Sequence, residues 1–404
     1  MLKKTPIATA ITLATLATPV LAESTDARIQ RLEAELNDLK AAVEATAEAV
    51  EGNTGTASNP SRAPGDHHGH GTTGRTTIGG YGELHYNNWR ARQGNGKKEE
   101  ADFHRFILFL GHEFNEKIRF FSELEVEHAL LADNNDGSGD TAPGEIALEQ
   151  AYLEFDLGKQ TRARGGILLM PVGFINETHE PPTFYGVERP IVEQKILPST
   201  WYEAGASLSG ELGSNGLSYD LLITTGLNGG TNIRGGRQKG AKATASDLAY
   251  TGRLKWTGLP GLELAGTASY QSDMTQDGSD NIGSGLLLTA QARYTLNRLT
   301  LSALYADWKI NGDGAKSTNK DKQDGYYLEG SWKFNPKVGV YARYSAWDNG
   351  GAGDTRKTRT EGGVNWWPHE QVVIKADVFS EDGGDAVSKT SLYNGFDLGI
   401  GYMF

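Results

Sequence analysis

The 404-residue sequence contains no cysteine, so it can form no disulfide and offers no cysteine for a lipid anchor. Beyond the amino-terminus it also lacks a run of roughly 20 apolar residues, the length that a membrane-spanning helix requires. Its mean hydropathy of -0.47 agrees with this exclusion. Acidic residues outnumber basic ones by 51 to 39, which argues against nucleic-acid binding. A Gly-x-Ser-x-Gly nucleophile motif is missing as well.

Glycine and large aromatic residues are abundant instead, with 52 Gly, 16 Tyr and 8 Trp. Barrels that cross a membrane look polar on average, because only alternate residues meet lipid. They also concentrate Tyr, Trp and Phe at the two membrane interfaces. The composition is therefore compatible with a transmembrane β-barrel.

The amino-terminus has the features of a secretory signal. Lys3 and Lys4 precede an apolar run from Ile7 to Leu21, and small residues end it at Ala22. We therefore expect residues 1–22 to be a signal peptide. A membrane anchor is the alternative, although the run is short and rich in threonine for that role.

Residues 23–52 have the spacing of a short coiled-coil helix. Apolar residues recur at alternating steps of three and four, and charged residues fill most positions between them. We expect a parallel coiled coil of three chains in the periplasm, and a surface helix packed on its own domain is the alternative. Residues 53–76 are rich in Gly, Ser, Thr, Asn and Pro, which predicts a flexible linker. The heptad positions are Ile29, Leu32, Leu36, Leu39, Val43, Thr46 and Val50.

From residue 77 to residue 404 the sequence alternates with a period of two, as strands do. In the last segment, Leu392 to Phe404, the large apolar residues share one face, and Asp397 with several glycines occupies the other. An apolar outer face and a small, polar inner face are what a closing barrel strand needs. Tyr402 and Phe404 resemble the carboxy-terminal assembly signal of Gram-negative outer-membrane proteins.

The lengths of the links between segments distinguish a barrel from a soluble β-sandwich, which the alternation alone would also fit. Reading from residue 77, we count about 16 strands, and short turns alternate with long polar links. This asymmetry is typical of outer-membrane barrels, with turns in the periplasm and loops outside the cell. We therefore predict an all-β, 16-stranded antiparallel barrel whose two ends lie in the periplasm. The long links are residues 90–100, 132–144, 174–200, 228–246, 272–284, 311–324, 349–357 and 382–390.

The alternate residues that face away from lipid are rich in charge, with basic and acidic residues in roughly equal numbers. So many charges predict a water-filled channel rather than a plugged or lipid-binding interior. Most of them individually are expected to be solvated wall residues. The candidate pore-lining residues are Arg105, Arg119, Arg164, Arg253, Lys255, Arg293, Lys333, Arg343, Arg359, Lys375, Glu123 and Glu125.

One long link, Phe174 to Thr200, is far richer in proline, aromatic and aliphatic residues than a solvated loop would be. Such a segment packs against a surface, and the nearest one is the inner wall of the barrel. We expect this third loop to fold inward and narrow the pore, and a covering over the subunit interface is the alternative. The candidate constriction residues are Phe184, Tyr185, Glu188, Arg189 and Lys195.

The stretch from Gly173-Phe174 through Pro182-Thr183-Phe184 to Glu188-Arg189, together with the layout, resembles the phosphate-selective porin O/P family. The resemblance implies a homotrimer, an inward third loop and diffusion of small anions. Anion-selective members of that family line the pore with arginines and lysines, whereas acidic residues match the basic ones here. We therefore expect a porin for small hydrophilic solutes and ions, among them phosphate or carboxylates. Its expected partners are the lipid bilayer, lipopolysaccharide and the outer-membrane assembly machinery.

Three further interpretations remain at this stage. His67, His68 and His70 in the linker form a weak metal candidate, since three imidazoles so close in sequence can reach one ion. An adhesin or structural tether would suit the coiled coil but leave the charged inner parity unused. An outer-membrane hydrolase would need a nucleophile with a paired base, which no motif indicates. We expect no enzyme activity and no cofactor.

Overall fold

The computed structural model describes residues 72–73, 75–130, 144–279 and 281–404. The expected signal peptide, coiled coil and nearly all of the linker, with its histidines, lie outside this part of the chain. All described residues belong to one compact unit, Ala63–Phe404. Among them, no helix is long and apolar enough to cross a membrane.

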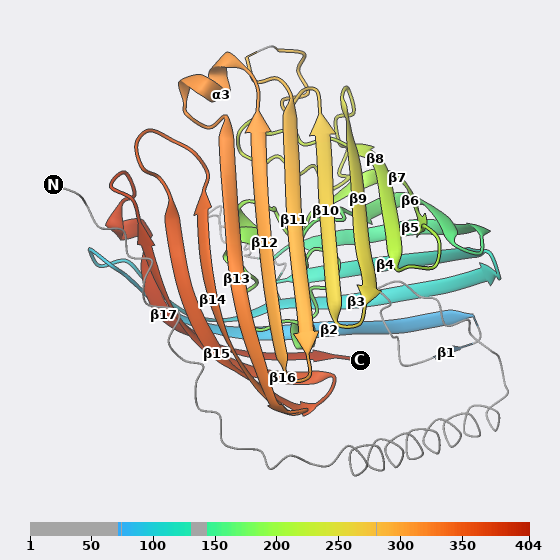
Figure 1. The fold of residues 1–404 in the computed structure, drawn as a ribbon, viewed down its shortest axis with the longest axis horizontal. Helices are drawn as coiled ribbons and strands as arrows, with labels where there is room; N and C mark the ends of the chain where they lie inside the picture. Colours follow the sequence, from blue (N-terminus) through green and yellow to red (C-terminus); the bar gives the residue numbers. More distant parts are fainter. Residues whose placement is uncertain (1–71, 74, 131–143, 280) are drawn as a thin grey trace, which may run out of the picture. The chain divides into compact units, whose positions relative to one another are not determined.

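The regular secondary structure of the described residues is almost entirely β-strand (Figure 1). Two short α-helices, α2 (Ile191–Lys195) and α3 (Asp313–Ser317), and two 3₁₀ turns, η1 (Pro181–Thr183) and η2 (Lys389–Ser391), lie in the links. The strands are β1 (Thr72–Thr73), β2 (Thr76–Ala91), β3 (Lys97–Asn115), β4 (Ile118–Glu127), β5 (Ile146–Gly158), β6 (Thr161–Leu169), β7 (Tyr202–Glu211), β8 (Leu217–Thr225), β9 (Leu248–Leu259), β10 (Leu262–Gln271), β11 (Gly285–Leu296), β12 (Leu299–Ile310), β13 (Lys322–Asn335), β14 (Val338–Asp348), β15 (Lys357–His369), β16 (Val372–Gly383) and β17 (Tyr393–Met403).

Strands β2 to β17 form a closed ring in which every strand pairs with its neighbours in antiparallel orientation. The ring closes where β17 pairs with β2, from Met403 opposite Tyr81 to Tyr393 opposite Ala91. The two-residue β1 pairs with β2 and adds nothing to the ring. The prediction of a 16-stranded antiparallel barrel is confirmed. Closure matters because it leaves no unpaired strand edge in contact with lipid.

The barrel exposes apolar side chains on its outer face and buries polar ones inside, which is the reverse of a soluble protein. On β17 the outward Leu398 is 46% exposed, whereas the inward Asp397 is 2% exposed. The same inversion recurs around the ring, with exposed Leu264 and Leu288 outside and buried Thr267 inside. An apolar outer band and a polar interior are stable only when lipid surrounds the barrel. In these strands the apolar side chains therefore point outward and the polar ones inward, as predicted.

The links also differ between the two rims. At the short-turn rim, where both described ends of the barrel lie, most links are two residues long, such as 297–298. At the opposite, long-loop rim they include residues 170–201 (loop L3) and 226–247 (loop L4).

One predicted long link is wrong. Residues 90–100 are mostly strand, because β2 and β3 continue into a hairpin with only residues 92–96 between them. Cross-strand contacts extend the pairing to the rim. Arg90 lies 3.0 Å from Glu99, and the Lys98 ammonium lies 4.5 Å from the ring centre of Trp89. Such pairs stabilise antiparallel strands whatever the polarity of the segment.

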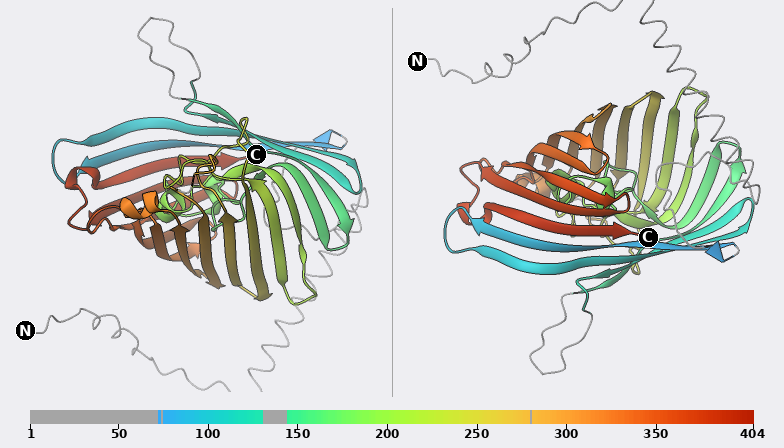
Figure 2. Two further views of the ribbon diagram at one scale, coloured as in Figure 1. Left: turned by 90° about the horizontal axis from the view of Figure 1, so that it is seen from above. Right: turned by 90° about the horizontal axis from the view of Figure 1, so that it is seen from below.

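Loop L3, which connects β6 to β7, lies inside the ring of strands, where Figure 2 shows it in green. Its apolar residues, including Ile191, Val192 and Trp201, pack in one cluster against inward residues of β8 to β14, such as Leu304 and Trp308. This cluster is the main hydrophobic core of the described chain, and it sits within the barrel. The inward loop therefore fills one side of the lumen.

Candidate functional site

Loop L3 is fixed to the barrel wall by hydrogen bonds that reach its backbone. Residues 182–187 are held on one side, where Trp367 donates to the Pro182 carbonyl at 3.2 Å and Asn365 to that of Phe184 at 3.1 Å. The Val187 amide donates to Asp377 at 2.6 Å. These bonds satisfy the polar backbone that an irregular segment carries into the barrel.

The short helix α2 is held by a buried carboxylate. One oxygen of Glu193 accepts from the amides of Phe174 and Ile175 at 3.0 and 2.8 Å. The other oxygen accepts from the Tyr327 hydroxyl of β13 at 2.7 Å. Three donors on a fully buried side chain tie both ends of L3 to the wall.

A polar cavity of about 270 Å³ remains between L3 and the wall of β2 to β5. Three segments line it. The wall strands and their loop-side ends contribute mostly carboxylates and histidines, L3 contributes residues 187–200, and L4 contributes basic side chains. The lining residues are Glu83, His85, His104, Arg105, Glu125, Glu127, His128, Glu145, Glu149, Val187, Glu188, Arg189, Gln194, Ser199, Thr200, Tyr202, Arg234, Arg237 and Lys239.

On the wall side of the cavity, acidic groups are paired with the one wall arginine. Arg105 of β3 lies 2.7 Å from Glu83 and 3.4 Å from Glu125. His85 lies between Glu83, at 3.2 Å, and Glu188 of L3, at 3.4 Å. Acidic groups are therefore in excess on this side, because its one arginine is shared between two of several carboxylates.

On the loop side, three arginines donate only to neutral oxygens within the described part of the chain. Arg189 donates to the Thr200 hydroxyl at 2.8 Å, and its second terminal nitrogen has no hydrogen-bond partner although the side chain is buried. Arg234 donates to the Ser199 carbonyl at 2.7 Å, and Arg237 to the Pro198 carbonyl at 3.1 Å. None of the three forms an ion pair with a carboxylate among the described residues, and all three line the cavity. Guanidinium groups of this kind bind phosphate and carboxylate oxygens.

Five of the residues singled out from the sequence contact or line this cavity region. Arg105, Glu125, Glu188 and Arg189 belong to its lining. Glu123 lies just behind it, fully buried, where it accepts from Gln150 at 2.6 Å and lies 3.2 Å from His179 of L3.

The inward basic residues of β14 to β16 do not line the cavity, and two of them hold L3. Arg343 pairs with Glu329 at 2.6 Å and donates to the Tyr185 carbonyl at 2.9 Å. Lys375 donates to the Gly186 carbonyl at 2.7 Å. Arg359 pairs with Glu381 of the neighbouring strand at 2.5 Å.

The remaining basic candidates lie elsewhere on the wall. Arg119 and Arg164 share Glu154, at 2.8 and 2.7 Å. Arg253 pairs with Asp220 at 2.7 Å and with Glu177 of L3. Further along the wall are Arg293, which lies 4.2 Å from the ring centre of Phe174, the half-buried Lys255, and Lys333, which is exposed and lies 4.5 Å from the ring centre of Trp367.

Three of the five candidate constriction residues are outside the cavity lining. The ring of Phe184 lies 3.6 Å from the Lys375 ammonium, and that of Tyr185 packs edge-on against Trp367 at 5.5 Å. Lys195 is exposed, and its carbonyl accepts from Asn349 at 2.9 Å. The two aromatic residues therefore anchor the loop on its wall-facing side.

Comparison with known proteins adds the family. The model of the phosphate-selective porin O and P family matches residues 76–404, which is the whole barrel. The chain belongs to this family. The porin is also 30% identical over 350 residues to an uncharacterized protein of Aquifex aeolicus, and the alignment covers 76% of each chain.

Solved structures share the fold of this porin. The anion-selective porin of Comamonas acidovorans matches with a TM-score of 0.57 at 12% identity, over 81% of this chain and 99% of that one. OmpT of Vibrio cholerae in its trimer form matches with a TM-score of 0.53 at 12% identity, over 82% and 100%. Family and fold together identify an outer-membrane channel protein.

The sequence alone did not single out the L4 side of the porin's cavity. Arg234, Arg237 and Lys239 lie in a stretch read only as a long polar link. A signal was present, because these residues and Lys242 form a basic cluster without acidic neighbours in an otherwise acidic chain. Their approach to L3 depends on the closed ring, which the linear pattern does not show.

Proposed function

We propose that this porin conducts small hydrophilic solutes and ions by passive diffusion, and that small anions such as phosphate or carboxylates bind at its constriction. The constriction in this proposal is the cavity between L3 and the wall of β2 to β5. The observation that carries the proposal is the group of Arg189, Arg234 and Arg237, which line the cavity and, among the described residues, hydrogen-bond to neutral oxygens and form no ion pair with a carboxylate.

The separation of charge across the cavity supports conduction of more than one kind of solute. Arginines lie on the loop side, while Glu83, Glu125 and Glu149 lie on the wall side. A cavity with an excess of basic groups on one side and of acidic groups on the other offers separate paths to anions and cations and orients dipolar solutes. We therefore infer a mild anion preference in place of strict phosphate selectivity.

The tight attachment of L3 supports a permanently narrowed pore. The loop is bound to wall strands on several sides, through contacts such as Val187 with Asp377 and Tyr327 with Glu193. A segment held in this way sets the pore width without opening and closing during transport. We infer that a loop fixed in this position restricts passage to small solutes.

We further propose that the porin is a homotrimer in the outer membrane, with its amino-terminal segment in the periplasm. The V. cholerae OmpT of the same fold forms a trimer. The heptad spacing of residues 29–50 would suit a three-chain coiled coil beside the barrels. Light scattering of the detergent-solubilised protein would give the number of chains.

The function is tested by single-channel conductance of the purified, folded protein in a planar bilayer. We expect stepwise conductance and, in a gradient of potassium chloride, a reversal potential on the anion side. A folded, heat-modifiable oligomer that gives no conductance would overturn the porin function. A structural tether would then be the favoured function. A cation-side reversal potential would overturn only the anion preference.

A further inference from the structure

A β-bulge in β3 directs two metal-ligating side chains into the pore. Opposite β2, Glu83 pairs with Arg105 and His85 with Asp102, so that Phe103 and His104 together face the single Leu84. The extra residue changes the alternation of side chains, and Asp102, His104 and Arg105 all come to the inner face. Bulges of this kind re-aim side chains, often beside functional sites.

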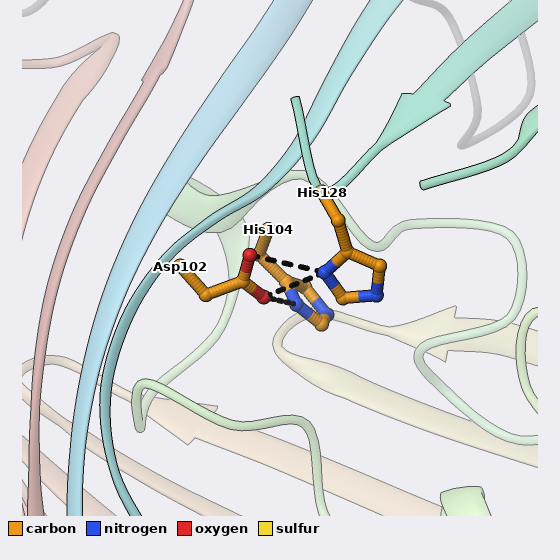
Figure 3. A group of neighbouring side chains, drawn as sticks. All are labelled: Asp102, His104 and His128. Atoms are coloured by element: carbon orange, nitrogen blue, oxygen red, sulfur yellow. Dashed lines mark hydrogen bonds and ion pairs between the residues drawn. The ribbon is translucent and has the colours of Figure 1, made fainter. Parts of the chain in front are cut away.

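A third ligand comes from the neighbouring strand. His128 follows the last residue of β4, and its amide contacts the His104 carbonyl at 3.3 Å. Figure 3 shows the two imidazoles converging on the carboxylate of Asp102. The distances from the Asp102 oxygens to Nδ1 are 3.0 Å for His104 and 2.9 Å for His128.

The three ligand atoms have the spacing of a metal site. One nitrogen of each imidazole and one carboxylate oxygen all lie within 4.8 Å of one another. Tetrahedral ligands at bond lengths of about 2.0–2.1 Å are separated by about 3.3 Å, so small side-chain movements would bring these atoms around one ion. Two imidazoles and one carboxylate suit divalent transition metals, whereas Mg²⁺ and Ca²⁺ prefer oxygen ligands alone.

The site is also accessible and supported. His104 and His128 line the polar cavity, so an ion and its water ligands could enter from the pore. The side chains of Asp102, His104 and His128 are only 18–32% exposed. His85 stacks on His104 with ring centres 4.7 Å apart, while Glu83 and Glu188 bind its own nitrogens. His85 therefore orients the His104 ring and is not itself a ligand.

We propose that Asp102, His104 and His128 bind one divalent transition-metal ion per subunit on the wall of the pore. The donor set and its open side match Zn²⁺ with water completing the coordination. Because binding depends on these three side chains, it stands independently of which solute the porin conducts. A bound ion would reverse the local negative charge of Asp102 beside the cavity.

Calorimetric titration with Zn²⁺ tests the proposal. The protein is the full chain with His67, His68 and His70 replaced by Asn, so that the amino-terminal histidines contribute nothing. We expect one Zn²⁺ per subunit, with affinity falling by about tenfold or more in each of Asp102→Asn, His104→Asn and His128→Asn. The control is His112→Asn, at a β3 residue that contacts Thr76 far from the cluster, and it should keep the background affinity.

A spectroscopic measurement covers the case in which a β3 variant fails to fold. Cu²⁺ added to the background protein should show electron paramagnetic coupling to two nitrogens, and to one in His128→Asn, which lies beyond the end of β4. No Zn²⁺ binding by the background protein would overturn the proposal. So would unchanged affinity in both histidine variants, or a Cu²⁺ signal without nitrogen coupling.

Discussion

The ammonium group of Lys375 on β16 donates a hydrogen bond of 2.7 Å to the carbonyl oxygen of Gly186 in L3 and lies 3.6 Å from the ring centre of Phe184. A residue expected from its inward position to be a pore-lining cation thus holds L3 instead. Its ammonium group contacts a backbone carbonyl and an aromatic ring within the barrel. The same use of a wall cation occurs at Arg343, which donates to the Tyr185 carbonyl.

Replacing Lys375 with Met should loosen L3. The substitution keeps most of the aliphatic stem but removes a charged hydrogen bond, whose contribution is about 1.5–3 kcal/mol. We expect faster proteolysis within L3 and noisier single-channel currents, with the barrel still folded. Lys337→Met, at an exposed turn residue, is the matched control, and equal behaviour of the two variants would show that Lys375 does not anchor the loop.

Replacing Glu193 with Leu should have a larger effect. The amides of Phe174 and Ile175 and the hydroxyl of Tyr327 would lose their acceptor in a buried site. Each unsatisfied buried group costs about 1–3 kcal/mol. We expect L3 to leave its position and conductance to rise. Glu193→Gln keeps an acceptor oxygen, so its conductance should lie between those of the native porin and the Leu variant. A Leu variant whose L3 is as well ordered as in the native porin would contradict the role of Glu193 in holding the loop.

Reversing the charge of Arg189 tests the anion path. Arg189→Glu should move the reversal potential in a salt gradient toward cations, with the anion-to-cation permeability ratio falling by about twofold or more. Arg234→Gln with Arg237→Gln should act in the same direction. Arg298→Glu makes the same charge change in a short turn outside the cavity. If it shifts the potential as much as Arg189→Glu, the effect is one of net charge and not of the constriction.

The docking of L3 should weaken at alkaline pH because of His179. Burial alone would lower the pKa of this imidazole, but the charge of Glu123 and the hydrogen bonds to Glu123 and Glu149 together outweigh burial, and the pKa of His179 is raised to about 10. A raised pKa means that the imidazolium stabilises the folded state fully below the unfolded value of about 6.5 and that this stabilisation is lost as pH rises through 10. Proteolysis of L3 should therefore accelerate over that window.

The variant His179→Gln supplies the comparison for the pH effect. Gln can still contact Glu123 and Glu149 but carries no proton that titrates in this range. Its L3 should be cleaved at a rate that changes less with pH than in the native porin. An equally steep dependence in the variant would assign the pH effect to another group.

The outer face predicts a depth-dependent cost for charge. Leu398→Arg, in the middle of β17, should destabilise the barrel by about 2–4 kcal/mol, whereas Asn394→Arg near the long-loop rim should cost about 0–1 kcal/mol. Both side chains point outward in the same strand. Unfolding in lipid vesicles measures the difference. Equal costs would mean that lipid does not surround this part of β17.

Much of this fold follows from period-two alternation and link length. One face of each strand meets lipid and the other meets water. In segments such as Leu392 to Phe404, the alternation of apolar and polar residues therefore shows which side chains point outward and which point inward. The inward position of L3 follows from its apolar content, since Trp201 and Ile191 need a surface to cover them. These features are local in the chain, and the sequence predicts them well.

The site was less predictable because it depends on contacts between distant segments. Arg237 of L4 donates to the carbonyls of Pro198 and Thr200 in L3, a meeting that only the closed ring produces. The bulge at Phe103 and His104 breaks the alternation on which the inner-face list rests, so neither Asp102 nor His104 was expected in the lumen. Lys375 and Arg343 point inward as predicted, but they bind L3 and do not line the cavity. Alternation along a strand gives the direction of a side chain and not its partner.

The seam of the ring has a consequence for how this protein reaches its final form. Gly80 and Phe404 exchange two backbone hydrogen bonds, each of 2.9 Å. Strand β17 thus completes the pairing begun by β2, so the ring cannot close until both strands are in place. Contacts so far apart in sequence slow folding and leave two open edges until the end. A chain shortened by its final strand would keep both edges and aggregate instead of inserting.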